Sequence, residues 1–473
     1  MRHSHLVRGS GRYKRRMTDA FDGSRSADVG VGVDPELAQS LTSKPTTVWI
    51  TMLAIAARLI AAGLLIFGPW TDEPAELSGW DIERFTIIAT EEGTPWRDYP
   101  VEYPPGSVVI FEALTAGDSD AVENDVVIVR AHRILILLAL AADLVLAWLL
   151  YRRSSRAGLG YLILGLPLVP MGLLRLDVVV ALLATAAALL AVGSGRREIR
   201  PDGTDLQEQP DATVRFWRPD LGAAILTAAA ILTKVWPGLL IPAFWGIRRD
   251  RTAVAAVLTT ALGLVAWLAW ARAGFDPIRQ VVDLRGATGW HVESSGGVLT
   301  VLADVTGVVP LSGESPVQFQ LNAFRIGKIS PALVTAGRVA TVAVTVGLAW
   351  RARSGTDHDN DHDTEVLVRF GAVMLGATSV LLATSPLLSP QFILWLTPWA
   401  ALTLTGRPTR RITQPAVITA VIAVLTGATL AVFGPPRMAE IAPAALMAFR
   451  NVALLTLPFS CWRLLGLDPG SGG

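Results

Sequence analysis

Residues 221–247 read LGAAILTAAAILTKVWPGLLIPAFWGI, a long apolar run that is interrupted at Lys234 and Pro237. An α-helix needs about 20 apolar residues to cross the roughly 30 Å hydrocarbon layer of a membrane. The run is longer than that, but Pro237 removes a backbone hydrogen bond and clashes with the preceding turn. We therefore predict that the run crosses the membrane twice, as two short helices that meet at residues 234–237.

The rest of the chain has the composition of a membrane protein. Of its 473 residues, 51% are hydrophobic and 17% are charged, whereas soluble domains contain about 25% charged residues. The apolar runs are continuous rather than alternating, which excludes a membrane β-barrel. Together with residues 221–247, the runs predict an all-α polytopic integral membrane protein with about 11–12 transmembrane helices. The other predicted crossings are residues 48–67, 134–151, 161–174, 178–192, 253–271, 332–350, 366–383, 392–404, 416–433 and 444–465.

Clusters of basic residues predict the orientation, because short loops rich in Lys and Arg stay in the cytoplasm. The clusters agree with one another only if residues 221–247 cross twice, and both chain ends are then cytoplasmic. The basic leader (residues 1–45) is predicted to be disordered, with Met17 as a second possible start, and residues 466–473 form a tail. The predicted transmembrane domain covers residues 46–465. Its outside face carries the loops 70–125 and 273–330, residues 175–177, Lys234 and the turn 385–391.

The first outer loop is strongly acidic. Between Trp70 and Asp125 the chain has fourteen Asp or Glu residues and two Arg, far more acids than a simple connector needs. Asp81 lies in the loop after the first span and is our first candidate for a general base that takes the proton of an acceptor hydroxyl. The alternative is that Asp81 caps a helix beginning at Ile82. Residues 107–114 are too short to cross and predict a helix at the membrane surface.

Further along the same loop, Glu102 and Tyr103 precede two prolines, Pro104 and Pro105. Proline fixes the backbone, so both side chains are held rigidly, as a substrate-binding site requires. In the alternative interpretation the prolines only shape the start of the following helix, and Glu102 faces water.

Two cations suit a phosphate-bearing ligand. Lys234 lies inside an apolar run, where an ionisable residue is a functional hypothesis by default, and Arg175 can donate two hydrogen bonds at once to a phosphate. Asp177 lies beside Arg175 as a substrate-binding candidate. The alternatives are structural. Arg175 and Asp177 either pair with neighbours across a tight hairpin or extend to the membrane–water interface. Lys234 in that case lies at the same interface, in an aromatic belt with Trp236.

The outer segments contain three further candidates for substrate binding: His291, Glu293 and Gln391. The alternative for residues 389–391 is structural, since Ser389 is a good helix cap and proline suits a first turn. The sequence predicts no metal-binding residues, and it leaves undecided whether the activity needs a divalent cation. Cys461 is the single cysteine, so an intramolecular disulfide is excluded. The chain has no phosphate-binding GxxxxGK[ST] loop, which argues against a nucleotide-driven pump, and no feature that supports nucleic-acid binding.

Taken in order, these motifs resemble the GT-C superfamily of membrane glycosyltransferases. They are most similar to the polyprenyl-phosphate-mannose-dependent enzymes of glycosyltransferase family 87 (the DUF2029 group) in actinobacteria. The resemblance extends over residues 48–405 and is carried by Asp81, the sequence YPP at 103–105, RLD at 175–177, KVWP at 234–237, WHVES at 290–294 and SPQF at 389–392. The first loop departs from the Asp-x-Asp pattern of some relatives.

The resemblance implies an enzyme of the plasma membrane whose catalytic domain, residues 46–465, works on the outer face. We expect it to be a monomer. A sugar, most simply mannose, would move from a polyprenyl-phosphate donor to a lipid-linked glycan with inversion. Asp81 would be the base, Arg175 and Lys234 would hold the donor phosphate, and membrane lipids would be the other partners. A secondary transporter or lipid flippase instead predicts charged residues near the bilayer midplane, whereas the polar residues here gather at outer helix ends. A non-catalytic envelope scaffold is the third reading.

Overall fold

The computed structural model describes residues 45–68, 80–116, 125–193, 212–247, 251–284, 289–308, 317–320, 323–354, 363–406, 408–433 and 441–466. The disordered leader and the tail predicted at the two chain ends lie almost wholly outside these residues. So do parts of both predicted outer loops.

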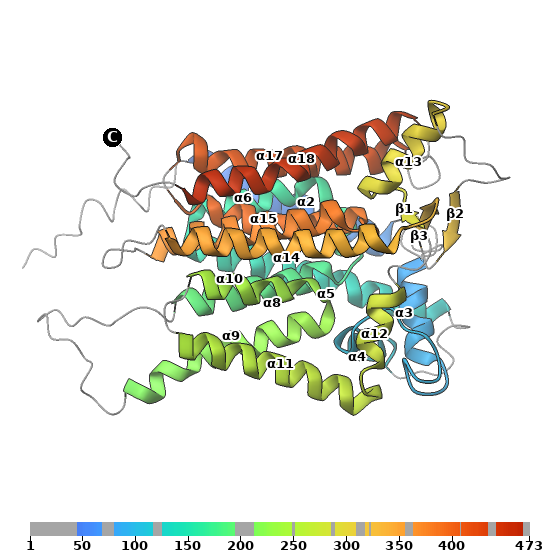
Figure 1. Cartoon of the computed structure of the whole chain (residues 1–473), viewed down its shortest axis with the longest axis horizontal. Helices are drawn as coiled ribbons and strands as arrows, with labels where there is room; N and C mark the ends of the chain where they lie inside the picture. Colours follow the sequence, from blue (N-terminus) through green and yellow to red (C-terminus); the bar gives the residue numbers. More distant parts are fainter. Residues whose placement is uncertain are drawn as a thin grey trace, which may run out of the picture. The chain divides into compact units, whose positions relative to one another are not determined.

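Eight helices among the described residues are long and apolar enough to cross a membrane (Figure 1). This confirms the prediction of a polytopic all-α membrane protein. The eight are α2 (Pro45–Phe67), α5 (Asp125–Arg153), α6 (Ser155–Gly165) continued by η3 (Leu166–Leu168) and α7 (Val169–Leu173), α11 (Arg251–Ala273), α14 (Pro331–Ser354), α15 (Asp363–Thr384), α17 (Arg410–Phe433) and α18 (Ile441–Leu465).

The other predicted crossings fall on helices whose apolar part is shorter than a full span. They are α8 (Asp177–Gly193), α9 (Ala212–Thr233), η5 (Trp236–Leu239) with α10 (Leu240–Ile247), and η6 (Pro390–Leu396) with α16 (Thr397–Thr403). Every predicted apolar run thus contains a helix, but the eight full-length helices are fewer than the 11–12 crossings expected. Prolines account for part of the difference, because Pro237 and Pro390 lie in the first turns of the 3₁₀ segments η5 and η6.

The interrupted run at residues 221–247 folds as a hairpin. Gly222, early in α9, packs against Leu190 near the end of α8, and Lys234, just beyond α9, approaches Asp177 at the start of α8. The chain then turns through η5 into α10, where Gly246 packs against Ala349 near the end of α14. A Cβ at Gly246 would lie 2.5 Å from the Ala349 carbonyl oxygen, so only glycine fits there. The predicted break at residues 234–237 is confirmed.

Elements that do not span the membrane gather at one end of the bundle (Figure 1). Four are helices: α3 (Trp80–Thr90), α4 (Pro105–Thr115), α12 (Asp276–Leu284) and α13 (Ser295–Val305). The other three are the strands β1 (Trp290–His291), β2 (Val317–Gln320) and β3 (Ala323–Ile326), which form an antiparallel sheet in the order β1–β3–β2. The short helix predicted at residues 107–114 is α4. The sheet in the second loop was not predicted.

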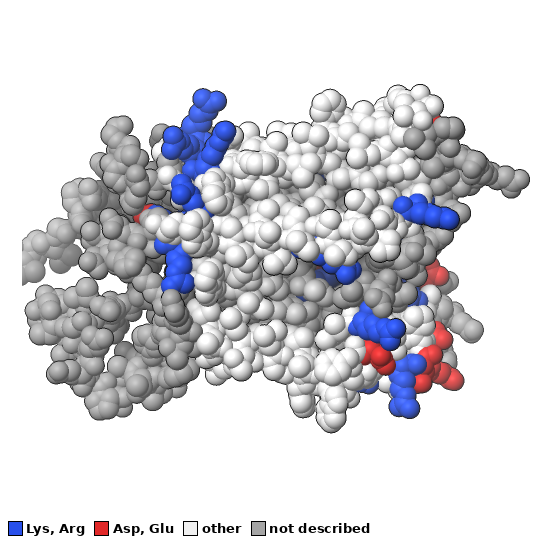
Figure 2. All heavy atoms as spheres, in the orientation of Figure 1, with Lys and Arg blue, Asp and Glu red and all other residues white. Residues whose placement is uncertain are grey.

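The distribution of charge follows this arrangement. Figure 2 shows Lys and Arg side chains at both ends of the bundle, acidic side chains mainly at the end that carries α3 and α12, and few charges on the surface between. A wide uncharged belt is what a protein surrounded by hydrocarbon requires.

Arg58 and Asp143 form an ion pair inside the bundle. Arg58 of α2 is 1% exposed and donates from Nε to Asp143 Oδ2 of α5 at 2.5 Å. The hydroxyl of Tyr161 in α6 donates to Asp143 Oδ1 at 2.5 Å, and Arg58 Nη1 donates to the Ala54 carbonyl. The expectation that charged residues avoid the interior of the spans is therefore wrong for Arg58 and Asp143. Each of the two residues supplies the opposite charge that compensates the cost of burying the other.

We predict that Arg58→Leu destabilises the protein by about 3–5 kcal/mol, because it leaves the Asp143 carboxylate buried without its counter-charge. The double variant Arg58→Leu/Asp143→Leu should recover part of that loss, since no buried charge is left. Unfolding of the purified protein in mixed micelles, followed by circular dichroism, gives the three free energies. A double variant at least as unstable as Arg58→Leu would contradict this account of the pair.

Candidate functional site

The first loop packs directly on the break in the hairpin. Ser107 Oγ donates to the Thr233 carbonyl at 2.6 Å. A Cβ at Gly106 would lie 2.8 Å from the Leu232 carbonyl oxygen, so glycine is needed for this approach. The contact brings Tyr103 and Pro104 next to Lys234, although the two segments are 130 residues apart in sequence.

Lys234 is held by one carboxylate and two aromatic rings. Its Nζ lies 3.8 Å from Asp177 Oδ2, 5.3 Å from the centroid of the Tyr103 ring and 5.7 Å from that of Phe392. Both rings are within the roughly 6 Å over which a cation is attracted to an aromatic face. Asp177 also accepts a hydrogen bond from Trp395 Nε1 at 2.7 Å. Three of the predicted segments, residues 103–105, 175–177 and 389–392, thus meet at this lysine.

A cavity of about 440 Å³ opens beside Lys234. Its wall is mostly apolar, and its two basic residues are Lys234 and Arg338 of α14. The remaining lining residues are Pro104, Val235, Trp236, Gly238, Leu239, Val281, Val334, Thr341, Leu381, Leu382, Thr384, Ser385, Pro386, Leu387, Phe392 and Trp395. No Asp or Glu occurs among these described lining residues. Such a wall suits a ligand with an apolar chain and an anionic head.

The two cations expected to hold a phosphate do not share this cavity. Arg175 precedes α8, is half-buried and lies outside the residues that line the cavity. Burial lowers the pKa of Arg175 to about 10, and the nearby Asp177 carboxylate opposes that shift. Arg338, which the sequence analysis did not single out, contributes to the wall instead. The sequence could have indicated Arg338, because an arginine inside an apolar run is a candidate functional residue by default.

The acids of the first loop have different surroundings. Asp81 lies in the first turn of α3, one residue before the buried Ile82, and its side chain is outside the described residues. Glu102 accepts two hydrogen bonds from Arg84, at 3.0 Å from Nε and 2.8 Å from Nη2. This bidentate pair leaves Glu102 less suited to act as a base. Tyr103 is buried, with its ring edge-on to Phe85.

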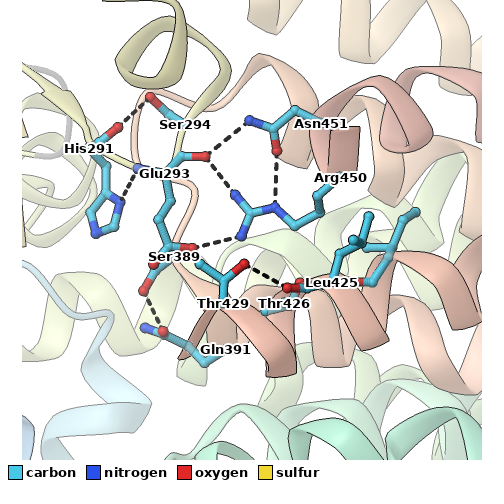
Figure 3. A network of polar contacts seen from close by, with 11 residues as sticks. His291, Glu293, Ser294, Ser389, Gln391, Leu425, Thr426, Thr429, Arg450 and Asn451 are labelled. Atoms are coloured by element: carbon cyan, nitrogen blue, oxygen red, sulfur yellow. Dashed lines mark hydrogen bonds and ion pairs between the residues drawn. The ribbon is translucent and has the colours of Figure 1, made fainter. Parts of the chain in front are cut away.

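The second loop, which contains β1, is fixed to α18 by a buried network (Figure 3). Arg450 Nη1 donates to Glu293 Oε2 at 2.7 Å and Arg450 Nη2 to the Glu293 carbonyl at 2.6 Å, while Asn451 Nδ2 donates to the same carbonyl at 3.1 Å. Glu293 is 4% exposed and Arg450 1%. The predicted substrate contact of Glu293 therefore competes with a structural ion pair. Arg450 and Asn451 were missed, although Arg450 interrupts a predicted span.

His291 and Gln391 lie on either side of this network (Figure 3). The His291 amide donates to the Pro386 carbonyl at 2.9 Å, and His291 Nδ1 accepts from the Glu293 amide at 3.2 Å. Gln391 Oε1 accepts a hydrogen bond from Ser389 Oγ. These contacts join the second loop to the turn at residues 385–391. Burial, together with Arg325 and Arg450, lowers the pKa of His291 to about 3.

The structure therefore brings together most of the segments that the sequence placed on one side. Gln280 of α12 adds a further link, because it accepts from the Val101 amide at 3.1 Å and donates to the Trp96 carbonyl. Lys234, Asp177 and Tyr103 share one cluster, and His291, Glu293, Ser389 and Gln391 form a second. The described residues contain no group of three or more His, Cys, Asp or Glu placed to hold a metal ion.

Comparison with models of known protein families and with curated proteins gives no match to this chain.

The low pKa of His291 makes a prediction about stability against pH. Folded His291 stays neutral down to about pH 3, whereas an unfolded histidine takes up a proton near pH 6.5. Because the unfolded state binds more protons, lowering the pH from 7 to 4 removes stability, by up to about 1.4 kcal/mol per pH unit. The variant His291→Gln should lack this component.

The measurement is the free energy of unfolding of wild type minus that of His291→Gln between pH 4 and 7. Burial raises the pKa of Glu293, so Glu293 contributes a slope of the opposite sign, but this slope is common to both proteins and cancels in the difference. A difference that does not change with pH would contradict the placement of His291.

Proposed function

We propose that the chain is a glycosyltransferase of the GT-C type that takes its sugar from a polyprenyl phosphate. The observation that carries the proposal is the Lys234 ammonium on the wall of a largely apolar cavity of about 440 Å³. A donor of this class has an isoprenoid chain, a phosphate and a sugar, and the wall matches the first two. The donor chain would lie along the apolar residues, with its phosphate between Lys234 and Arg338.

The same proposal assigns the remaining segments. The full set of 11–12 crossings would place Lys234, the first loop and the second loop on the outer face of the plasma membrane. Arg175 would act on the phosphate indirectly, through the Asp177 carboxylate that also approaches Lys234. Asp177 and Tyr103 would position Lys234. Glu102, His291, Glu293 and Gln391 would form the acceptor side, with Glu293 held in place by Arg450.

The reaction is a displacement at the anomeric carbon. The oxygen of the acceptor hydroxyl forms a bond to that carbon, and the bond between the carbon and the phosphate oxygen breaks. The electron pair of the broken bond leaves with polyprenyl phosphate, whose charge Lys234 and Arg338 stabilise. The Asp81 carboxylate takes the hydroxyl proton. Attack from the face opposite the leaving group inverts the anomeric configuration.

The second candidate is a secondary transporter or lipid flippase. The specific observation in its favour is the Arg58–Asp143 pair inside the spans, since intramembrane ion pairs mark transport pathways. Neither residue lines the cavity beside Lys234. Helix packing is therefore the simpler role for the pair.

The test is transfer of radiolabelled mannose from polyprenyl phosphate mannose in membranes that contain wild type, Asp81→Asn or Glu83→Gln at equal expression. Glu83 is the matched control, because it is an exposed acid two residues further along α3. We expect Asp81→Asn to lower the transfer rate by about 10²–10⁴, the contribution of a general base. Glu83→Gln should change the rate less than about twofold, because an exposed surface charge has little effect.

Each other result has a defined meaning. Equal transfer by wild type and Asp81→Asn would show that Asp81 is not the base but only a residue in the first turn of α3. The base would then be sought at Glu102, whose pair with Arg84 would have to open. No transfer by any form would refute the mannose donor and favour the transporter or the scaffold. Parallel reactions with Mg²⁺ and with EDTA decide whether the reaction needs a divalent cation.

A further inference from the structure

A second cavity, of about 550 Å³, lies at the opposite end of the bundle from Lys234. It is formed where α14 ends, α17 begins and α18 ends. The lining residues are Arg351, Arg410, Arg411, Gln414, Ser460, Trp462, Arg463 and Gly466. Figure 2 shows Lys and Arg side chains gathered at this end. Nothing in the proposed transfer reaction uses this cavity.

Four of the eight lining residues are arginines, and none of these described residues is Asp or Glu. Four guanidinium groups around one space repel one another, so the cavity favours an anionic occupant. Each group can donate two parallel hydrogen bonds to a phosphate. Four such forked donors match two phosphate groups, with two guanidinium groups for each phosphate.

Arg351 is fixed in place at this cavity. Its guanidinium lies over the Trp462 ring at 5.6 Å. The end of the guanidinium packs directly on Gly466, since a Cβ there would lie 2.3 Å from Arg351 Nη2. Arg351 Nε is buried and has no hydrogen-bond partner among the described residues. A positively charged donor is thus held before any ligand arrives, which lowers the entropic cost of binding.

The hydroxyl of Ser460 provides independent evidence for a ligand. Ser460 is 4% exposed and lines the cavity, and its Oγ has no hydrogen-bond partner within the described part of the chain. Hydroxyls elsewhere on the same helices bond to carbonyls of the preceding turn, as Thr429 Oγ1 does to the Leu425 carbonyl at 2.7 Å (Figure 3) and Thr456 Oγ1 does to Ala453 at 2.7 Å. A buried hydroxyl without a partner costs free energy, and a phosphate oxygen would satisfy it.

We propose that this arginine cavity binds an anion with two phosphates. The site lies at the ends of membrane-spanning helices, where basic pockets hold lipid headgroups, so a diphosphorylated lipid headgroup and a soluble diphosphate are the two sources of this chemistry. The inference does not rest on the glycosyltransferase proposal.

The experiment uses native mass spectrometry of the full chain in detergent, with two probes. Cardiolipin represents a lipid with two phosphates, and inorganic pyrophosphate represents a soluble diphosphate; phosphatidylcholine is the neutral reference. The variant Arg410→Gln/Arg411→Gln removes two cations from the cavity. The variant Arg152→Gln/Arg153→Gln is the matched control, because it removes two arginines that the sequence places on the same side but outside the cavity.

We expect the wild type to bind at least one of the two probes more tightly than phosphatidylcholine. Arg410→Gln/Arg411→Gln should weaken that binding by about tenfold or more, because each basic side chain near an anionic headgroup contributes about fivefold. The control should weaken it less than about twofold. Ser460→Ala keeps all four arginines and should weaken it by about threefold or more through loss of one hydrogen bond to a charged group. This variant serves if the double variant fails to fold.

Binding of cardiolipin alone would assign the site to a lipid headgroup, and binding of pyrophosphate that displaces cardiolipin would assign it to the diphosphate itself. The proposal is overturned if neither probe binds better than phosphatidylcholine. It is also overturned if both arginine pairs weaken binding equally, because the basic face as a whole would then attract the probe.

Discussion

The ammonium of Lys234 has to be compensated, because it lies between two apolar helices where an isolated charge is costly. The compensation comes from Asp177 at 3.8 Å and from the faces of Tyr103 and Phe392. Those partners belong to three segments that are far apart in sequence. The requirement to neutralise one lysine therefore draws the first loop, the start of α8 and the η6 segment to the tip of the α9–α10 hairpin, and the cavity forms beside it.

A second buried cation, Arg450, fixes the loop that contains β1 at the same end of the bundle. Arg450 of α18 holds Glu293 through its carboxylate and its carbonyl. The backbone contact between His291 and Pro386 then ties that loop to the turn before η6. This loop and the Lys234 cluster meet at η6, where Trp395 donates to Asp177. Rigid attachment to spanning helices is what a site needs to hold two substrates in register.

The sequence was informative where the signal is local. Continuous apolar runs predicted the spans, and Pro237 predicted the break after Lys234. Pairings between distant helices have no local signal, so the partners of Glu293 and Asp143 were not predicted. Arg58, Arg338 and Arg450 each lie inside an apolar run, where a charge costs free energy. That cost could have identified them as candidates. It could not have predicted which acid or cavity each of them faces. The small sheet was missed because β1 and its neighbours are only two to four residues long and depend on pairing for stability.

The most direct test of the central claim is photo-crosslinking with a polyprenyl phosphate that carries a diazirine in its first isoprene units, with the labelled residues mapped by mass spectrometry. The account predicts labels on cavity residues such as Val235, Val334 and Leu381, and loss of these labels in Lys234→Met. Labels spread over the outer surfaces of the spanning helices, or cavity labels that persist in Lys234→Met, would contradict it.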